Sequence, residues 1–446
     1  MWKRLASPLL PITTGVLTVL SLAAQNADRV SWGDIWLPAG LAGLFGFIMW
    51  GVFWLIPFTR RPAALDATFI VLVTMLWTLI PFKPALPLMI GTLFIVFASA
   101  GPNTHKVIPS LTSVAVVACV LSLGLFAVTG NSVSASSSMN TVKLNSTPDI
   151  YFIVPDRFTS PAALREMGLN PDRFIQELRD RGFAVPEDNM SDDPYRAGDK
   201  ASYTTRTLRY MASVLNMGKV IDADIPYLVA GSMVKSPEVA HILQGNGYEY
   251  HHIGSWFPET AYSMVADYNY QYPSYSLSSR FNGSLFAASV IDRSGFRALN
   301  YVPFLTDEAR ARTERGRQLY QIETFKKIAG QTGNPKFVFL HILLPHPDYY
   351  WKADGTPQDE ILAEPEAYKA QVQHTMTVLL DLVDSIQDED AIIIIQSDEG
   401  IAYLDNELNK TLPDSQWNGV LSAWRGIEGN INTRDVLKAV IEGLEE

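Results

Sequence analysis

Apolar residues are distributed very unevenly along this chain. Residues 1–130 are almost continuously apolar, whereas the rest alternates apolar and polar stretches as a globular domain does. A helix needs about 20 apolar residues to cross a bilayer, and a buried helix of a soluble protein would carry a polar face, which is missing here. The pattern therefore predicts a transmembrane helical domain over residues 1–130. Its five expected helices cover residues 8–25, 34–57, 65–82, 85–101 and 107–129.

The positive charges in the short loops predict the orientation of this domain. We do not expect the first apolar segment to be a cleaved signal peptide, because four more apolar segments follow it. The more positive loops face the cytoplasm, and five crossings that start inside place everything after residue 130 outside. We therefore expect a multi-pass protein of the cytoplasmic (inner) membrane with an extracytoplasmic C-terminal domain. The inner side carries Lys3, Arg4, Arg60, Arg61 and Lys106, and the outer side carries Arg29 and Lys83.

The polar part of the chain begins with a serine-rich stretch. Residues 131–147 read NSVSASSSMNTVKLNST, a composition typical of a flexible linker. Residues 148–446 then alternate short β-branched or aromatic runs with helical patterns. Alternating strands and helices predict an α/β domain with a mainly parallel sheet. The clearest segments are strands at 150–154, within KFVFLHILLPHPDYY (336–350) and at 391–396, and helices at 170–182 and 366–386.

Polar residues of interest come directly after three of these strands. Asp156 follows IYFIV, His341 follows FVFL, and Asp398 and Glu399 follow IIII. In open parallel sheets, ligands bind beyond the carboxyl ends of the strands, so we expect one shared site. Two adjacent carboxylates repel each other unless a cation or a shared proton lies between them. The alternatives without a functional role are that the acid pair lies in a solvent-exposed loop and that Asp156 is an ordinary turn residue.

Hydroxyl and imidazole side chains extend the set of candidates. A helical pattern in SYTTRTLRYMASVLNMGK, residues 202–219, places Thr204, Thr205 and Thr207 near a helix start. A helix N-terminus attracts anions, and a threonine there is either an N-cap or a nucleophile activated by a metal. His251 and His252 alternate faces on an expected strand, so at most one faces the site. We take His252 as the candidate substrate-binding residue of this pair.

Charge and cysteine content exclude two kinds of chemistry. The formal net charge of −11 argues against nucleic acid, because phosphates need a basic surface. The single cysteine, Cys119, lies in the fifth apolar segment. The outer domain therefore has neither a disulfide nor a thiol nucleophile.

Taken in order, these motifs resemble the membrane-anchored, sulfatase-like branch of the alkaline phosphatase superfamily. The resemblance covers most of residues 148–446, and the membrane helices followed by an outer domain also look like lipoteichoic acid synthases and phosphoethanolamine transferases. The motifs that carry it read PDIYFIVPDRFTSP, the threonine-bearing helix ending in SVLNM, HHIGSW, FVFLHILLPHPDYY and IIIIQSDEG.

The resemblance implies a role for each candidate. Asp156 and Asp398 would bind one divalent metal ion (Mn, Mg, Ca or Zn), with Glu399 as a further ligand. Thr207 would be the nucleophile, and Thr205 or Thr204 would replace it if the register differs by a few residues. His346, in a segment similar to the family's PHPPY, would bind the anionic oxygens of the substrate or act as an acid, and His341 would support it.

Three departures from the family pattern bear on activity. The family reads SDHG where this chain reads SDEG, so Glu399 replaces a metal-binding histidine. An all-oxygen ligand set favours Mg²⁺, Mn²⁺ or Ca²⁺ over Zn²⁺, and three carboxylates around a divalent ion weaken its attraction for a phosphoryl group. The nucleophile segment lacks the usual Asn-Tyr-Pro lead-in, and PHPD replaces PHPP, which puts Asp348 near the pocket. A formylglycine-forming C/S-x-P-x-R segment is also missing at the nucleophile position, so we do not expect sulfate-ester hydrolysis by that route.

Three hypotheses of function follow. The first is a membrane-anchored, metal-dependent transferase or hydrolase of phospho-groups that acts on a membrane lipid or an envelope glycan outside the membrane. The second is a catalytically degenerate pseudoenzyme that binds an envelope component or a partner protein; Glu399 and the incomplete nucleophile segment favour it. The third is a purely structural membrane subunit, which predicts that Asp156, Thr207 and Asp398 lie apart.

Overall fold

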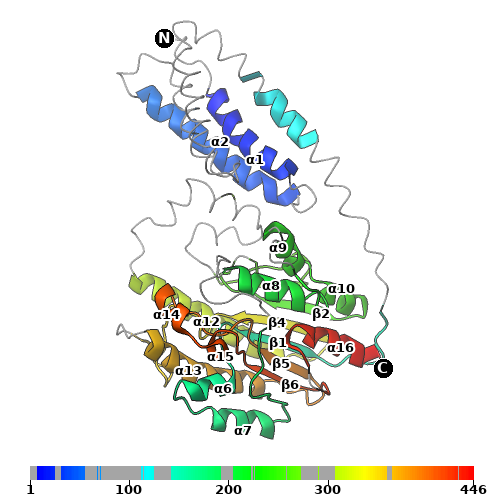
Figure 1. The fold of residues 1–446 in the computed structure, drawn as a ribbon. Coiled ribbons are helices and arrows are strands. Elements are labelled where there is room, and N and C mark those ends of the chain that lie inside the picture. The colour runs from blue at the N-terminus through cyan, green and yellow to red at the C-terminus, as the bar shows by residue number, and fades with distance from the viewer. Residues whose placement is uncertain are drawn as a thin grey trace. The chain divides into compact units, whose positions relative to one another are not determined.

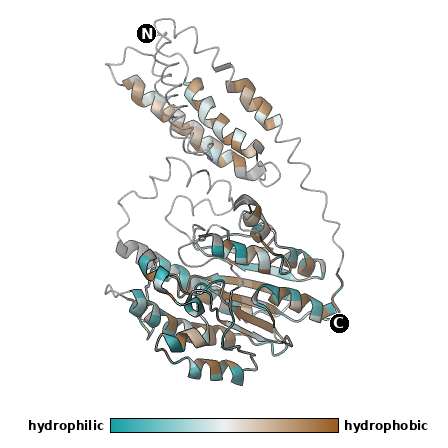
Figure 2. Ribbon diagram, viewed as in Figure 1, coloured by the Kyte–Doolittle hydropathy of each residue, from teal (hydrophilic) through white to brown (hydrophobic). Residues whose placement is uncertain are grey.

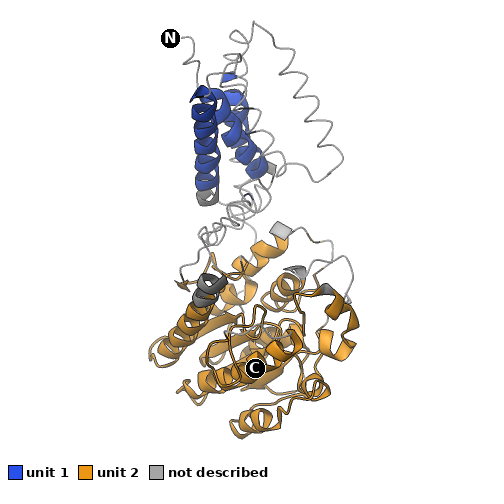
Figure 3. Ribbon diagram, turned by 90° about the vertical axis from the view of Figure 1, so that its left-hand side faces the viewer, with its two compact units in different colours: residues 1–138, 275–303 blue, residues 139–274, 304–446 orange. Residues whose placement is uncertain are grey.

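The computed structural model of the chain forms two compact units (Figure 3). The first comprises residues 1–138 and 275–303, and the second comprises residues 139–274 and 304–446. The structure describes residues 8–25, 32–55, 68, 71, 112–113, 115–124, 142–191, 204–221, 225, 227–257, 259–272, 290, 307–358, 364–429 and 431–445.

The first unit contains two closely packed helices, α1 (Leu9–Gln25) and α2 (Trp32–Leu55). A Cβ atom at Gly15 would lie 2.4 Å from the carbonyl oxygen of Ala42, and one at Gly46 would lie 2.4 Å from that of Pro11. Only glycine permits such an approach. Small residues four apart, as at Ala42 and Gly46, are typical of helix contacts inside membranes.

One described helix, at Ile35–Leu55 within α2, is long and apolar enough to cross a membrane. Shorter apolar helices cover Leu9–Ala24 and Ala115–Gly124. Figure 2 shows how apolar these segments are compared with the helices of the second unit. Their outer faces expose large apolar side chains, among them Trp36, Phe47, Trp54, Leu55, Val120 and Leu121. Such a surface suits lipid rather than water.

Most of the other predicted crossings fall outside the described residues. Residues 85–101 lie outside them, as do residues 65–82 except for positions 68 and 71. Of the expected helix at 107–129, the described part is helical at 112–113 and 115–124. The number of five crossings therefore remains a prediction.

The second unit is built on a six-stranded sheet with the order β3-β2-β4-β1-β5-β6 (Figure 1). All strand pairs are parallel except β5 with β6, which is antiparallel. The prediction of an α/β domain with a mainly parallel sheet is confirmed. The strands are β1 (Ile150–Pro155), β2 (Glu249–Ile253), β3 (Tyr268–Tyr270), β4 (Lys336–Ile342), β5 (Ile392–Gln396) and β6 (Ser422–Arg425).

Helices cover both faces of the sheet, so the central strands β1, β4 and β5 are buried along their whole length. One core packs Tyr151 and Ile153 against the first set of helices, α6 (Pro161–Glu166), α7 (Asp172–Asp180), α12 (Asp307–Ala329) and α13 (Glu364–Asp384). The other packs Ile150 and Phe152 against the second set, α8 (Thr204–Val214), α9 (Tyr227–Lys235), α10 (Glu238–Gly245) and α16 (Val436–Glu445). Short helical turns at α14 (Asn406–Thr411), α15 (Asp414–Trp417) and Thr433–Asp435 complete the domain.

The end of the predicted linker belongs to this domain. Leu144 is buried in the second core, and its backbone N–H donates to the side chain of Asn246. The backbone N–H of Asn145 donates to the carbonyl oxygen of Leu444. Residues 142–147 are therefore packed against the domain, while residues 131–141 lie outside the described part of the chain.

Candidate active site

Three predicted site residues meet at one edge of the sheet. Asp156 follows β1, His341 lies near the end of β4, and Asp398 lies two residues beyond β5. These strands are neighbours and parallel, so their carboxyl ends lie together. Each residue offers a ligand atom, and the three atoms lie within 4.8 Å of one another. The hypothesis of a purely structural subunit predicted instead that Asp156 and Asp398 lie apart.

The unsatisfied atoms of these residues fit a bound cation. Within the described structure, Asp156 Oδ1, His341 Nε2 and Asp398 Oδ2 are buried and have no hydrogen-bond partner. Buried polar atoms without a partner are costly, and a group of three converging ligand atoms needs an explanation. A divalent ion would satisfy all three atoms together. We call Asp156, His341 and Asp398 the ligand triad.

The charges of the two aspartates are strongly coupled. Burial raises the pKa of Asp398 well above its usual value, and the charges of Asp156 and Glu399 raise it further. Burial also raises the pKa of Asp156, but His346, His341 and Arg157 outweigh that effect, so its pKa lies below the usual value. Without a cation, the pair therefore favours one ionised and one protonated carboxyl group.

A hydroxyl group orients the imidazole of the triad. Thr260 Oγ1 lies 2.7 Å from His341 Nδ1, and the hydroxyl of Ser255 lies 2.9 Å from that of Thr260. Because Thr260 engages Nδ1, it turns Nε2 of His341 toward Asp156, whose Oδ2 lies 3.3 Å away. Partners of this kind fix the ring and tautomer of a metal-binding histidine.

The structure places His252 behind this hydroxyl rather than in the triad. Its Nε2 lies 2.8 Å from the carbonyl oxygen of Thr260, and its Nδ1 lies 3.0 Å from the hydroxyl of Tyr250. Both ring nitrogens thus have protein partners. The substrate-binding role of His252 stays a prediction, while its neighbour His251 pairs with Tyr270 at 3.1 Å.

Thr207 reaches the site from the first turn of α8. Its side chain is buried, and its hydroxyl donates a hydrogen bond to Asp398 that partly opposes the effect of burial, which raises the pKa of that carboxyl group. The helix α8 thus brings Thr207 to the acids, and the role of Thr207 as the nucleophile stays a prediction. Nothing is described of the side chains of Thr204 and Thr205.

His346 is half-buried next to the triad. Its ring packs edge-on against Trp256 with 5.7 Å between the centroids. Burial and the charge of Arg157 lower its pKa to about 3, so the ring is neutral at neutral pH. A neutral imidazole can hydrogen-bond to an anionic oxygen but is a weak acid. The nearby Asp348 accepts a hydrogen bond of 2.9 Å from the hydroxyl of Tyr350.

Glu399 is held by two buried arginines. Its Oε1 lies 2.8 Å from Arg157 Nε, and its Oε2 lies 3.3 Å from Arg206 Nε. Arg206 in turn lies over the ring of Trp417, 4.3 Å from the centroid. The ligand triad does not include Glu399. Its predicted role as a metal ligand is untested, but in this structure both of its oxygens face guanidinium groups.

Sequence reasoning did not identify Arg157, Arg206 or Thr260 as parts of the site. The sequence does give a reason to consider Arg157. This residue directly follows Asp156 at the end of a buried strand, where three nearby acids need positive charge. Its φ angle of 65° is unusual for a residue other than glycine. Nothing comparable singled out Thr260, which lies 81 residues before His341 along the chain.

Comparisons with known proteins give fold-level similarities alone. No family model matches the sequence, and no curated protein matches it. Similar solved structures include the C-terminal periplasmic domain of EcEptC from Escherichia coli, at 12% identity and a TM-score of 0.37, covering 66% of this chain and 76% of the other. The integral membrane protein lipooligosaccharide phosphoethanolamine transferase A from Neisseria meningitidis matches at 11% identity and a TM-score of 0.38, covering 98% and 92%. A 2-O GAG sulfatase matches at 12% identity and a TM-score of 0.37, covering 67% and 71%.

Proposed function

We propose that this protein is a membrane-anchored, metal-dependent transferase or hydrolase of phospho-groups, of the sulfatase-like branch of the alkaline phosphatase superfamily. The observation that carries the proposal is the ligand triad, whose three unsatisfied atoms converge while Thr207 donates to Asp398. A buried cation site beside an oriented hydroxyl is the arrangement that nucleophilic attack on phosphorus requires.

The ligand triad would hold the ion. Two carboxylates and an imidazole suit Zn²⁺ or Mn²⁺ better than Ca²⁺. When bound, the ion supplies positive charge that stabilises an alkoxide and a phosphoryl group. Asp156 and Asp398 then both remain ionised.

Thr207 is the proposed nucleophile. Its oxygen would form a bond to phosphorus while the bond from phosphorus to the leaving oxygen breaks. The threonine proton would pass by way of Asp398, its hydrogen-bond acceptor, to the leaving oxygen, so that Asp398 is ionised again. The neutral ring of His346 would donate a hydrogen bond to a phosphoryl oxygen. Water or an acceptor hydroxyl would then take the phospho-group, and its proton would return to the oxygen of Thr207.

The proposed site of action is outside the cytoplasmic (inner) membrane. Five crossings beginning inside would place residues 148–446 there, anchored beside membrane lipids and envelope glycans as substrates. The apolar outer face of α2 and the close α1–α2 contact support a membrane anchor. Multi-pass topology is part of the proposal.

A specific observation favours the pseudoenzyme as the second candidate. Glu399, at the position of a metal-binding histidine in the resembled family, is neutralised by Arg157 and Arg206. Protein groups thus supply part of the positive charge that a metal would otherwise supply. On this hypothesis the outer domain binds an envelope component or a partner protein without turnover. Gain of activity in Glu399→His would identify a site disabled at that position.

The test uses the full-length protein in detergent, loaded with Mn²⁺ or Zn²⁺ and supplied with a chromogenic phosphodiester. We expect slow release of the chromophore and a phosphorylated peptide that contains Thr207, detected by mass spectrometry. Thr207→Ala should abolish both, whereas Thr377→Ala, which removes an exposed hydroxyl of α13, should change neither. Unchanged turnover in Thr207→Ala contradicts the assignment.

A further inference from the structure

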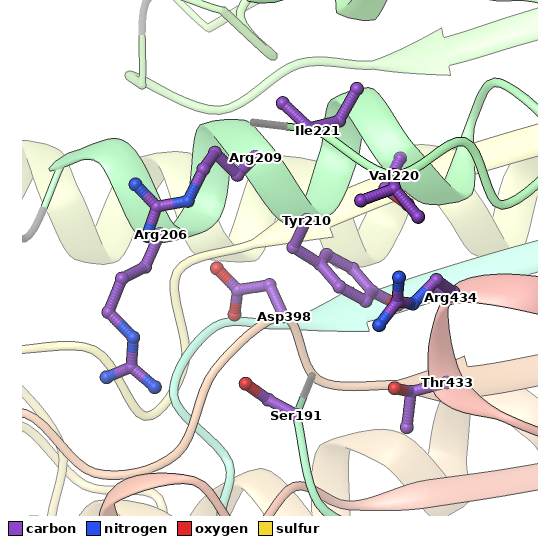
Figure 4. A pocket seen from close by; sticks show the side chains of 10 residues that line it. Ser191, Arg206, Arg209, Tyr210, Val220, Ile221, Asp398, Thr433 and Arg434 are labelled. Atoms are coloured by element: carbon purple, nitrogen blue, oxygen red, sulfur yellow. The ribbon is translucent and has the colours of Figure 1, made fainter. Parts of the chain in front are cut away.

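The two faces of the sheet differ in what they bring to the site. On the face covered by α8, Asp398 borders a cavity of about 300 Å³ (Figure 4). On the other face, α12 and α13 each place one buried glutamine against the segment that carries His341 and His346. These glutamines are Gln321 of α12 and Gln371 of α13. The proposed reaction does not use either of them.

The backbone that follows β4 needs partners from outside the sheet. β4 ends at Ile342, and residues 343–350 lie in neither a helix nor a strand. Much of this segment is nevertheless buried, and buried backbone N–H and C=O groups are costly unless they form hydrogen bonds. Glutamine side chains supply several of these hydrogen bonds.

Gln371 makes three hydrogen bonds to the loop at residues 346–351. Its Nε2 donates to the carbonyl oxygen of His346 at 2.9 Å. Its Oε1 accepts from the backbone N–H groups of Tyr350 at 2.7 Å and Trp351 at 3.2 Å. One buried amide therefore joins both ends of the loop, and it fixes where the backbone of His346 lies.

Gln321 holds the neighbouring strand ends in the same way. Its Nε2 donates to the carbonyl oxygen of His341 at 2.8 Å and to that of Gly254 at 3.0 Å. Trp256 comes two residues after Gly254, and its ring packs edge-on against that of His346. Gln321 thus fixes the backbone on the Trp256 side of this ring contact, while Gln371 fixes the backbone on the other side.

We propose that Gln371 is a positioning residue of the site, whose buried amide keeps the ring of His346 against Trp256 and beside the ligand triad. This inference rests on the proposed function, in which His346 binds a phosphoryl oxygen. A displacement of about 1 Å at a reacting centre can cost roughly a hundredfold in rate. Loss of the amide should act through His346 rather than through the metal, because Gln321 and Thr260 hold the triad ligand His341 separately.

The test is a double-mutant cycle in the full-length protein in detergent, loaded with Mn²⁺ and supplied with a chromogenic phosphodiester. Gln371→Met removes the hydrogen bonds but keeps the length of the side chain. We expect kcat/KM to fall roughly ten- to a hundredfold while the metal content stays unchanged. In the background of His346→Ala, the same change should cost less than about twofold, because the ring that Gln371 positions is then absent.

Two further variants complete the cycle. Gln373→Met, at an exposed position of the same helix, is the control and should leave kcat/KM unchanged. Thermal melting identifies which variants fold. If Gln371→Met does not fold, Gln371→Asn takes its place, because it keeps a buried amide that is one methylene too short to reach the loop.

A second measurement does not depend on turnover. In a protein with isotope-labelled histidines, one of the seven ring signals in the NMR spectrum should disappear in His346→Ala and so identify His346. The ring current of Trp256 displaces this signal, and we expect it to move toward the position of a free histidine in Gln371→Met but not in Gln373→Met.

Two outcomes overturn the inference: an unchanged His346 signal in Gln371→Met, or an equal loss of kcat/KM from Gln371→Met with and without His346. A parent protein that shows no turnover, but whose His346 signal moves in Gln371→Met, would contradict the proposed function alone.

Discussion

Arg157 Nε lies 2.8 Å from Oε1 of Glu399, and the backbone N–H of the same arginine donates to Asp398 at 3.3 Å. One residue therefore contacts both acids that follow the isoleucine strand. Its side chain balances the charge of Glu399. Asp398 Oδ2 and Glu399 Oε2 both lack a hydrogen-bond partner in the described structure, but the guanidinium group of Arg206 lies 3.3 Å from the glutamate oxygen. The two adjacent carboxylates have different environments, and this difference suggests a bound cation for Asp398 but not for Glu399.

Removing the charge of Glu399 should destabilise the protein. Glu399→Gln would leave Arg157 and Arg206 buried without their carboxylate, and breaking a buried ion pair costs about 3–5 kcal/mol. Thermal unfolding of the full-length protein in detergent measures the loss. Glu407→Gln, at an exposed position of α14, is the control. Equal melting temperatures for the two variants would show that the arginines do not depend on Glu399.

The hydroxyl of Thr260 should control metal affinity. Thr260→Val removes the partner of His341 Nδ1 while keeping the side chain's shape, and losses of such partners weaken metal binding about 10- to 100-fold. Thr260→Ser keeps the hydroxyl and should bind nearly as tightly as the parent. Titration with Zn²⁺ against a competing chelator gives the affinities. Equal Zn²⁺ affinity in Thr260→Val and the parent would show that this hydroxyl does not control metal binding.

The buried His252 should make the fold sensitive to acid. Burial lowers its pKa from 6.5 to about 4, so the unfolded chain binds its proton first as the pH falls. The contribution of His252 is therefore complete above pH 6.5 and decreases toward pH 4, by about 1.4 kcal/mol per pH unit. Melting temperatures between pH 7 and 5 should fall more steeply in the parent than in His252→Gln. Parallel curves would contradict a buried neutral ring.

The contact between α1 and α2 should not tolerate a side chain at Gly46. A Cβ atom there would lie 2.4 Å from the carbonyl oxygen of Pro11, so Gly46→Ala must displace a helix, at a cost of about 1–3 kcal/mol. A Cβ atom at Gly51 on the same helix would meet nothing within 4 Å, and Gly51→Ala should be tolerated. Thermal melting in detergent compares the two variants. Equal stability would indicate that the helices do not pack in this way.

The positions of strand ends follow well from local sequence. The run IIIIQ and the pattern IYFIV predict buried strands, and their carboxyl ends do place Asp156 and Asp398 together. Parallel topology explains this success, because residues at the ends of neighbouring parallel strands must share one edge. The helix expected at 170–182 is observed at Asp172–Asp180, with Pro171 at the N-cap.

Side-chain direction is what the sequence did not reveal. Glu399 follows Asp398 directly, yet its carboxylate faces Arg206 of α8, a residue distant in the chain. Likewise, the sequence predicts that His341 supports His346 in substrate binding, but it gives no sign of the contact with Thr260 that directs Nε2 of His341 toward Asp156. Contacts between distant segments decide these orientations, and a local pattern carries no information about them.

Metal content of the purified full-length protein tests the central claim most directly. After incubation with Mn²⁺ and Zn²⁺ and removal of the excess, elemental mass spectrometry should find about one divalent ion per chain, as expected for a single site with buried ligands. Asp398→Ala removes a ligand and should lose the ion, while Glu399→Gln should keep it in whatever fraction remains folded. An absence of bound metal in the folded parent protein, or equal metal content in Asp398→Ala, would contradict the account.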